Sequence, residues 1–337
     1  MKRSIFSLSA ALALVLFLAL PAAAEEESAD LNVSGFIDTH YGKLLKSGDG
    51  EATNNSGGFF LDAVVVYLDK SLGEKYRVFA DLGFYNDGGA SVDQAFAEGR
   101  FLDDQLTFTF GKFDAPIGFE LVDAPDMYQF SHSIVYDNLI PGYHTGLMAN
   151  FAPNDWFSVI AYVTNGIDTD FEDNKEKAIG GRLGVSFEKF GGGVSFVRAN
   201  TTNDADGGYN EDASTQIIDV DLAATPVENL TLGGEFNLNT EDDGTSDRTA
   251  MGILAMAHYD FITHDTYTLG CTLRGGYIDW DADNDMTQTE LTAALTGVLD
   301  PAGATFVLEY RMDDMDFDNA PDETDDHAIA LEWVFLF

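Results

Sequence analysis

His327-Ala-Ile-Ala-Leu-Glu-Trp-Val-Phe-Leu-Phe337 closes the sequence and decides the fold. Counted back from the end, every second residue is large and apolar: Phe337, Phe335, Trp333, Leu331 and Ile329. A period of two places these side chains on one face of a β-strand and Glu332 on the other face. Soluble proteins rarely end on their most apolar strand, whereas the closing strand of an outer-membrane barrel faces lipid on one side and an aqueous lumen on the other.

The first residues read as a leader for export. Met1-Lys2-Arg3 is basic, residues 5–20 are apolar apart from two serines, and Pro21-Ala-Ala-Ala24 offers an Ala-x-Ala cleavage site. An uncleaved membrane anchor is the alternative, but the apolar run is shorter than the roughly 20 residues of a helical span. We expect a signal peptide at 1–24, a short periplasmic lead-in at 25–30 and one barrel domain at 31–337.

The charge balance is strongly acidic. The chain has 58 Asp and Glu residues against 17 Lys and Arg, a net charge of −41 that becomes −43 without Lys2 and Arg3. This charge argues against binding to nucleic acid. After residue 24 no apolar run is long enough for a transmembrane helix, so a membrane-embedded chain must satisfy its backbone groups in a closed barrel.

Sixteen segments of alternating polarity follow the leader, an even number within the range of porins. Between residues 76 and 84, for example, apolar side chains alternate with Arg77 and Asp81. The predicted strands are residues 31–41, 58–69, 75–86, 92–102, 105–113, 143–151, 156–165, 177–188, 192–201, 214–225, 230–240, 248–260, 265–280, 287–299, 303–313 and 327–337.

The connections between these strands alternate in length. Short turns are predicted at 70–74, 103–104, 153–155, 188–191, 226–229, 262–264 and 300–303. Longer, acidic and glycine-rich loops are predicted at 42–57, 87–91, 114–142, 166–176, 202–213, 241–247, 281–286 and 314–326. Short periplasmic turns that alternate with longer external loops are typical of an up-and-down antiparallel barrel, with both chain ends on the periplasmic side.

The third long loop, residues 114–142, is far longer and more apolar than the others. Long loops in compact domains are usually functional, and an apolar one would bury its side chains by folding into the lumen against the wall. We therefore predict an inward-folded constriction loop. The alternative is an extra pair of strands, with Phe130–Val135 as one candidate.

Three short motifs lie in or near this loop: Gly111-Lys-Phe-Asp-Ala-Pro-Ile-Gly118, Tyr143-His-Thr-Gly146 and Asn165-Gly-Ile-Asp168. They resemble the OmpL-like family of outer-membrane β-barrel porins, and the first is also similar to an element of phosphate-selective porins. The resemblance implies a barrel with a pore, leaves its solute open, and is compatible with a homotrimer.

Charged residues alternate with the apolar positions of many strands. An Arg or Lys at the lipid midplane would cost about 2–4 kcal/mol, so these residues are expected to face the lumen. The expected pore-lining residues are Arg77, Asp81, Glu98, Arg100, Lys112, Arg182, Glu235, Arg274, Glu309, Arg311 and Glu332. The residues expected to narrow the pore from the 114–142 loop are Glu120, Asp123, Asp126 and Asp137, although Asp123 and Asp126 could instead cap turns around Pro125.

The balance of charges predicts the kind of channel. A phosphate-selective pore would need a ladder of Arg and Lys, and this chain has few bases and acidic loops. We predict a porin for passive diffusion of small hydrophilic solutes or ions, with a preference for cations. A non-conducting structural or adhesin-type barrel is the alternative.

Two other kinds of site have partial signatures in the sequence. Ser131, His132 and Asp137 have the residue types of a hydrolase triad, but closeness in sequence does not supply its geometry and Gly-x-Ser-x-Gly is absent, so we expect no enzyme. Residues 279–290 have acidic spacing like an EF-hand, but Asn284 stands where the loop needs glycine.

No cofactor is expected, although looser Ca²⁺ or Mg²⁺ sites in acidic loops at 279–290, 241–247 or 313–326 stay open as bridges to lipopolysaccharide phosphates. The expected partners are outer-membrane lipid, lipopolysaccharide and the barrel-assembly machinery, which would bind through Phe337.

Overall fold

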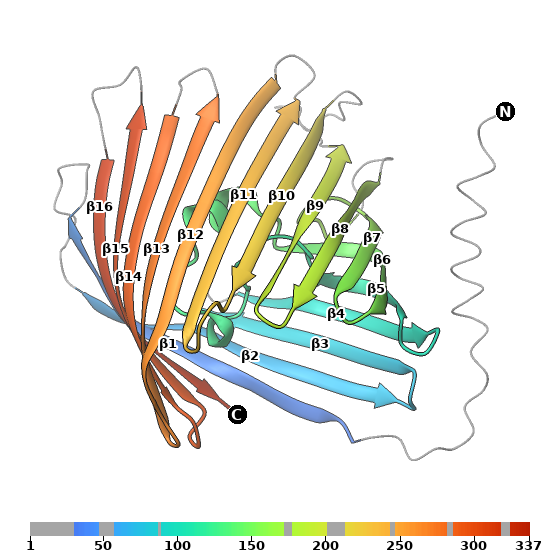
Figure 1. Cartoon of the computed structure of the whole chain (residues 1–337), viewed down its shortest axis with the longest axis horizontal. Helices are drawn as coiled ribbons and strands as arrows, with labels where there is room; N and C mark the ends of the chain where they lie inside the picture. The colour runs from blue at the N-terminus through green and yellow to red at the C-terminus, as the bar shows by residue number, and fades with distance from the viewer. Residues whose placement is uncertain are drawn as a thin grey trace.

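In the computed structural model the described residues form a closed antiparallel β-barrel of sixteen strands (Figure 1). The structure describes residues 30–46, 57–86, 89–171, 177–200, 213–242, 247–281, 286–317 and 324–337. The signal peptide predicted at 1–24 and all but the last residue of the lead-in at 25–30 lie outside these residues.

Each predicted strand is confirmed, with ends that differ by a few residues. The strands are β1 (Asn32–Lys46), β2 (Gly58–Leu72), β3 (Tyr76–Tyr85), β4 (Ala90–Phe101), β5 (Leu106–Asp114), β6 (Tyr143–Asn154), β7 (Phe157–Thr164), β8 (Ala178–Phe187), β9 (Phe190–Asn200), β10 (Ser214–Ala224), β11 (Leu230–Asp242), β12 (Asp247–His264), β13 (Tyr267–Asp281), β14 (Met286–Leu299), β15 (Ala304–Phe317) and β16 (Thr324–Leu336).

Two sequence-based assignments are wrong. The turn predicted at 262–264 belongs to β12, and the chain turns at residues 265–266 instead. The register of β12 against β13 shifts between Asp260 and Ile262, and such a bulge lets the strand continue where its alternation is interrupted. The alternative strand at Phe130–Val135 is also excluded, because a helix begins at Ile134 and residues 115–142, which are fully described, contain no strand.

The barrel closes through the first and last strands. β1 pairs with β16 in an antiparallel register in which Phe36 faces Leu336 and His40 faces Glu332. Phe337 adds two further backbone hydrogen bonds, one in each direction, both of 3.0 Å and both to Gly35. Phe337 therefore extends the pairing of β16 with β1, and the described strands form a closed ring without an open edge.

Connections of different length lie at the two ends of the barrel. One end carries short turns at 73–75, 102–105, 155–156, 188–189, 225–229, 265–266 and 300–303. The β5–β6 connection, which is much longer, joins its two strands at the other end. Both ends of the barrel domain, β1 at its start and β16 at its finish, lie at the short-turn end.

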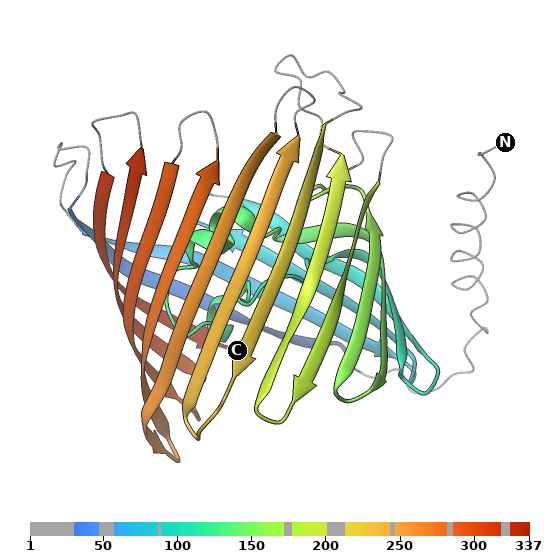
Figure 2. The same ribbon diagram turned by 45° about the horizontal axis from the view of Figure 1, so that its top comes forward.

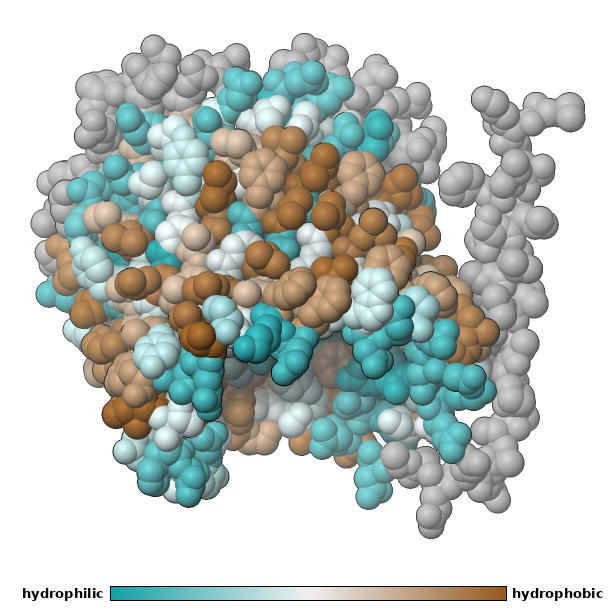
Figure 3. All heavy atoms as spheres, in the orientation of Figure 1, coloured by the Kyte–Doolittle hydropathy of each residue, from teal (hydrophilic) through white to brown (hydrophobic). Residues whose placement is uncertain are grey.

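The outer wall is apolar. Leu273, Leu291 and Leu295 are each at least half exposed, whereas their sequence neighbours Arg274, Glu290 and Thr296 are buried. Figure 3 shows brown, apolar residues over the middle of the strands that face the viewer. Aromatic rings gather where the short turns lie: Tyr76, Phe101, Phe108, Trp156, Phe187 and Phe190. An apolar band with an aromatic girdle at its edge is the outer surface that lipid requires.

Helices make up very little of the structure. No helix among the described residues combines the length and the apolar character needed to cross a membrane.

The β5–β6 loop, residues 115–142, contacts opposite parts of the wall. It contains the 3₁₀ helix η1 (Ala124–Asp126) and the α-helix α2 (Ile134–Leu139). The hydroxyl of Tyr67 on β2 donates to Asp123, while the backbone N–H of Gly118 donates to Asp219 on β10. β2 and β10 stand on opposite sides of the ring of strands. Figures 1 and 2 both draw α2 between the strands at the front and those at the back.

An apolar contact fixes α2 against β12 and β13. Val135 and Leu139 on the helix pack with Leu254 and Ile278 on the strands, and all four are buried. Ile253 lies on the opposite face of β12 and is exposed on the outer wall. This strand therefore carries apolar side chains on both of its faces. Ile117, Ile134, Val135 and Leu139 of the loop are buried, whereas Leu121 and Val122 are exposed.

Candidate functional site

Glu120 connects the β5–β6 loop to the wall through a buried ion pair. Its Oε1 accepts a hydrogen bond of 2.8 Å from Nη1 of Arg274 on β13, and the two side chains are 2% and 0% exposed. The other carboxylate oxygen accepts from the backbone N–H of Ser133 at 2.9 Å. The carboxylate thus faces the wall and the start of α2.

Arg274 is the centre of a larger network. Its Nε donates to Glu290 at 2.7 Å, and its Nη2 donates to the carbonyl oxygen of His132 at 3.0 Å. Glu290 also accepts from the backbone N–H of Ile134 at 2.9 Å, which satisfies one of the free donors at the first turn of α2. Several hydrogen bonds therefore hold the middle of the loop to β13 and β14.

Wall carboxylates hold other parts of the loop through its backbone. Glu235 on β11 accepts from the N–H of Phe119 at 2.7 Å. Glu309 on β15 accepts from the N–H groups of Phe130 and Ser131, and from the Ser131 hydroxyl at 2.7 Å. Both carboxylates are buried. These hydrogen bonds fix the position of the loop backbone against β11 and β15.

Among the described residues, the loop and the wall together line a larger and a smaller cavity. The larger, of about 980 Å³, lies toward the short turns and is lined partly by residues 103–105 and 152–158. The smaller, of about 320 Å³, lies between the loop and the end of β5, where Asp114 and Tyr136 face it. The residues that line both cavities are Gly118, Glu120, Leu121, Asp126 and Arg182. These shared residues define what we call the throat.

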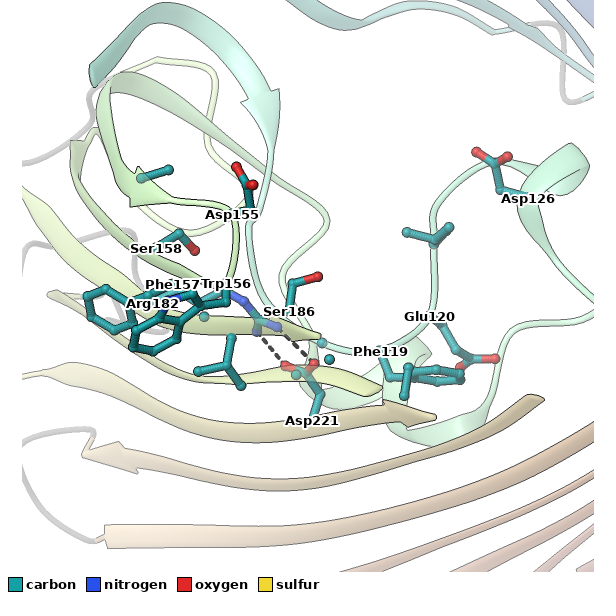
Figure 4. A pocket seen from close by; sticks show the side chains of 18 of the residues that line it. Phe119, Glu120, Asp126, Asp155, Trp156, Phe157, Ser158, Arg182, Ser186 and Asp221 are labelled. Carbon is teal, nitrogen blue, oxygen red and sulfur yellow. Dashed lines mark hydrogen bonds and ion pairs between the residues drawn. The ribbon is translucent and has the colours of Figure 1, made fainter. Parts of the chain in front are cut away.

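The throat is lined by an arginine of the wall, Arg182, and by an acidic residue of the loop, Asp126. Arg182 projects from β8, and its guanidinium makes a two-pronged ion pair with Asp221 on β10, with one N–O distance of 2.8 Å. Figure 4 shows this pair on one side of the cavity and Asp126, from η1, on the other side. Asp126 is exposed, so its charge faces the open space.

Acidic side chains dominate the lining of these cavities. The larger is lined by Asp103, Asp104, Glu120, Asp126, Asp155 and Asp221, and the smaller by Asp114, Glu120, Asp123 and Asp126. Arg182 is the one base among the described residues that line either cavity. Two of these carboxylates, Glu120 and Asp221, are paired with Arg274 and Arg182.

The predicted constriction residues fall into different positions. Asp126 lines both cavities, and Asp123 lines the smaller one while it accepts a hydrogen bond of 2.6 Å from Tyr67. Glu120 borders both cavities, although its carboxylate is bound by Arg274. Asp137 is exposed on α2 and borders neither cavity.

The predicted pore-lining residues are also divided. Arg182 reaches the throat, while Glu235, Arg274, Glu309 and Glu332 are buried. The first three of these hold the loop, a role that strand alternation did not indicate. Arg311 on β15 donates to the carbonyl oxygen of His132 and pairs with Asp313.

Several other predicted lining residues pair with their neighbours, and none of them borders the two cavities. Arg77 pairs with Asp69 at 2.9 Å and Arg100 with Glu98 at 2.9 Å. Lys112 pairs with Asp170 at 3.0 Å, and its ammonium lies 3.7 Å from the centre of the Tyr143 ring. Asp81 is buried on β3.

Asp123 has an altered acidity. Burial raises the pKa of its carboxyl group, the nearby Asp126 raises it further, and the hydrogen bond from Tyr67 opposes the shift. This carboxyl group therefore takes up a proton at a higher pH than an ordinary aspartic acid does.

The residues considered for a hydrolase triad make contacts of other kinds. Ser131 donates to Glu309, whereas the His132 ring is bonded to the carbonyl oxygen of Leu121 at 2.9 Å and stacked on Tyr136. The two side chains therefore have separate partners. In the described part of the chain no group of three His, Cys, Asp or Glu residues is placed to hold a metal ion. Residues 243–246, 282–285 and 318–323, which belong to the acidic loops considered as Ca²⁺ or Mg²⁺ sites, lie outside the described residues.

Comparison with solved structures finds porins and outer-membrane channels. The outer-membrane channel DcaP of Acinetobacter baumannii has a TM-score of 0.71 at 13% identity, with 94% of this chain and 100% of that chain covered. OmpT of Vibrio cholerae, in a trimer form, has a TM-score of 0.63 at 12% identity, covering 91% and 99%. An anion-selective porin from Comamonas acidovorans has a TM-score of 0.59 at 12% identity, covering 92% and 100%. At these identities the likeness shows the fold alone.

Sequence comparison adds the family. A comparison with curated protein sequences finds no significant match. The family model described as beta-barrel porin-2, OmpL-like, matches residues 31–337, which is the whole of the barrel domain. The resemblance seen in the motifs around the β5–β6 loop is thereby confirmed. With its sixteen-stranded closed barrel and its porin neighbours, the chain belongs to the OmpL-like beta-barrel porin-2 family of the outer membrane.

Proposed function

We propose that the protein is a porin through which small hydrophilic solutes and ions diffuse passively, and that it prefers cations. The observation that carries this proposal is the throat, where the loop and the wall approach each other around Asp126 and Arg182. Residues 114–142 act in this proposal as the constriction. The buried anchors at Glu120, Glu235 and Glu309 support it, because a loop that sets a pore radius must be held in one place.

The preference for cations is supported by the charges around the throat. Acidic side chains line both cavities, and Arg182, the one base of that lining among the described residues, is already paired with Asp221. Rings of Asp and Glu select cations in channels. The fold itself carries no such information, since a barrel of the same type from Comamonas acidovorans is anion-selective.

Current measurements test both parts of the proposal. The refolded barrel, inserted in a planar lipid bilayer, should open stable channels in KCl. In a tenfold KCl gradient the reversal potential should have the sign of a cation-selective pore. A barrel that inserts and never conducts would favour the structural or adhesin-type alternative, while a reversal potential of opposite sign would exclude the preference for cations.

The proposal extends to the binding partners of the barrel and to its subunit number. We infer that the apolar wall contacts outer-membrane lipid and lipopolysaccharide, and that Phe337 is read by the barrel-assembly machinery. The trimer form of the OmpT relative makes a homotrimer a reasonable assembly for this chain. Cross-linking of the protein in outer-membrane vesicles, followed by mass analysis, tests the subunit number.

A further inference from the structure

We propose that Gly193 on β9 controls the ion preference of the throat by allowing the guanidinium group of Arg182 to lie against the wall. Gly193 has no side chain that could touch an ion, so it acts through Arg182 as a positioning residue. This inference rests on the proposed channel function, because it names the residue that keeps the base of the throat from facing a passing ion.

The ion pair between Arg182 and Asp221 crosses a whole strand. Arg182 on β8 is paired in register with Ser195 on β9, and Asp221 on β10 is paired in register with Gly193. β9 stands between β8 and β10, at the front of the barrel in Figure 1 and in Figure 2. Neighbouring strands lie about 4.8 Å apart, so the arginine side chain spans two such spacings and lies along the wall.

Gly193 supplies the space that this crossing needs. A Cβ atom at residue 193 would lie 2.5 Å from Cζ of Arg182 and 2.7 Å from its Nε and Nη2 atoms. Cβ atoms do not approach other atoms so closely, so any residue other than glycine would displace the guanidinium group. The guanidinium group therefore lies directly over the backbone of residue 193.

The backbone of Gly193 gives no other reason for a glycine. Residue 193 lies inside β9, and it does not have the positive φ that favours glycine at Gly111 and Gly118. Glycine within a strand weakens the strand, and it often marks a place where another group approaches the backbone closely. Here that group is the guanidinium of Arg182.

Two polar partners hold the guanidinium group in this position. Its Nη1 donates a hydrogen bond of 3.0 Å to the hydroxyl of Ser195, and its Nη2 donates one of 2.8 Å to Asp221. The side chains of Arg182 and Asp221 are 17% and 7% exposed. The positive charge is therefore neutralised at the wall and largely shielded from solvent.

Arg182 lies where a change of its position would alter the charge of the throat. Among the described residues it is the one base that lines either cavity. Figure 4 shows its ion pair with Asp221 at the wall and Asp126 across the open space. A side chain at residue 193 would turn the guanidinium group away from Asp221 and toward that space. An unpaired positive charge there would repel cations and attract anions.

Gly191 provides a matched control on the same strand. It lies two residues before Gly193 and therefore on the same face of β9, and it borders the larger cavity without being part of the throat. The closest atoms to a Cβ atom there would be backbone atoms, the carbonyl oxygen of Val185 at 3.3 Å and Cα of Ser186 at 3.8 Å. Alanine at residue 191 therefore adds the same methyl group without touching Arg182.

Reversal potentials in a KCl gradient measure the effect of Gly193 on ion preference. Gly193→Ala and Gly191→Ala both leave the charge of the protein unchanged. We expect Gly193→Ala to lower the permeability ratio of K⁺ over Cl⁻ by at least about two-fold at low salt, and Gly191→Ala to leave the ratio unchanged. In an Arg182→Ala background, Gly193→Ala should not change the ratio, because the group that it displaces is absent.

Chemical labelling measures the position of Arg182 without any current. Phenylglyoxal reacts with accessible guanidinium groups, and mass spectrometry of peptides from the full barrel, labelled in detergent, gives the rate of reaction at each arginine. Arg182 should react at least about three-fold faster in Gly193→Ala than in the wild type or in Gly191→Ala. Arg100, whose side chain is 45% exposed, should react at the same rate in all three proteins.

The outcomes separate this inference from the proposed function. Equal permeability ratios and equal labelling in Gly193→Ala and the wild type overturn the inference even if the channel conducts. A fall in the ratio that persists in the Arg182→Ala background overturns it too. If Gly193→Ala does not fold, recovery of folding by Arg182→Ala supports the inference, and failure of the double variant overturns it. If labelling of Arg182 is faster in a barrel that never conducts, the positioning by Gly193 stands and the porin proposal fails.

Discussion

Arg274 on β13 and Glu120 in the β5–β6 loop form an ion pair of 2.8 Å in which both side chains are shielded from solvent. The pair joins residues that are 154 positions apart in sequence. It attaches the loop to the wall, so we expect its removal to lower the stability of the barrel and to change the proposed channel.

Arg274→Met should destabilise the loop. The change leaves the buried Glu120 without its cation and leaves Glu290 with only Arg311, at 3.8 Å. Breaking a buried pair in this way typically costs about 3–5 kcal/mol. We expect noisier single-channel currents and earlier unfolding in guanidinium chloride. Arg77→Met is the matched control: its pair with Asp69 is about one-third exposed, so it should cost less than about 1 kcal/mol. Equal effects of the two changes would contradict the anchoring role.

Gly233→Ala should displace the loop from β11. A Cβ atom at residue 233 would lie 2.0 Å from the ring of Phe119, and overpacking of this kind costs about 1–3 kcal/mol. The adjacent Gly234→Ala is the control, because its Cβ would meet nothing closer than the Leu254 carbonyl oxygen at 3.5 Å. Thermal unfolding in detergent should distinguish the two variants. If Gly234→Ala were the less stable variant, the contact between residue 233 and Phe119 would not be what holds the loop against β11.

Asp126→Asn should weaken the preference for cations. Asp126 is exposed in the throat, and its charge acts directly on a passing ion. We expect the permeability ratio of K⁺ over Cl⁻, obtained from reversal potentials, to fall by about two-fold at low salt, where charges are least screened. Asp300→Asn removes one charge at the barrel rim and should leave the ratio unchanged. An unaltered permeability ratio of K⁺ over Cl⁻ in the Asp126 variant would show that this residue does not contribute to ion selectivity.

Arg182→Gln should act in the opposite direction. The change removes the base of the throat and releases Asp221 from its ion pair. Both effects make the throat more negative, so the ratio of K⁺ over Cl⁻ should rise and the conductance for K⁺ should increase at low salt. Reversal potentials and single-channel currents, measured beside the Asp126 variant, check this expectation. If the permeability ratio changed in the same direction in both variants, the charges of Asp126 and Arg182 would not act on the same ion pathway.

The pH dependence of stability should report on Asp123. Its pKa is raised in the folded protein, chiefly by burial, so the folded state keeps this proton at pH values where the unfolded chain has lost it. The contribution of Asp123 to stability is therefore present below its ordinary pKa of about 3.9 and is lost as the pH rises through the higher folded pKa. Asp123→Asn should flatten this part of the profile and make the barrel more stable at neutral pH.

Unfolding by guanidinium chloride, followed through tryptophan fluorescence between acidic and neutral pH, measures this effect. Asp300→Asn serves as the control for loss of one charge. A lower stability of the Asp123 variant at neutral pH would mean that the hydrogen bond from Tyr67 outweighs the burial of the carboxylate.

The strands could be predicted because alternation and turn residues act locally. Glu332 among its apolar neighbours was enough to place the last strand and its inner face, and the structure buries that side chain. The end of β12 was missed because the bulge after Asp260 depends on its pairing with β13. Such a pairing is not visible in the strand's own residues.

The site could be predicted in part. The apolar content of residues 114–142 indicated burial, and the contacts of Val135 and Leu139 have that character. Alternation placed Arg274 and Glu309 on the inner face, but it could not show that the loop covers them, because that depends on contacts over more than 150 positions. One signal was overlooked: residues 250–256 are apolar on both faces, which is unusual for a wall that meets water on one side.

The hydrogen bonds between Phe337 and Gly35 have a consequence for assembly. They join the last residue to a strand at the start of the domain, so the ring cannot close before the whole domain has been synthesised and delivered. Until then two strands have free edges, which are templates for pairing with other chains. Contacts of such long sequence separation also form slowly. A chain that loses its final strand would therefore persist as an open sheet, and in the cell it would be a target for chaperones and proteases.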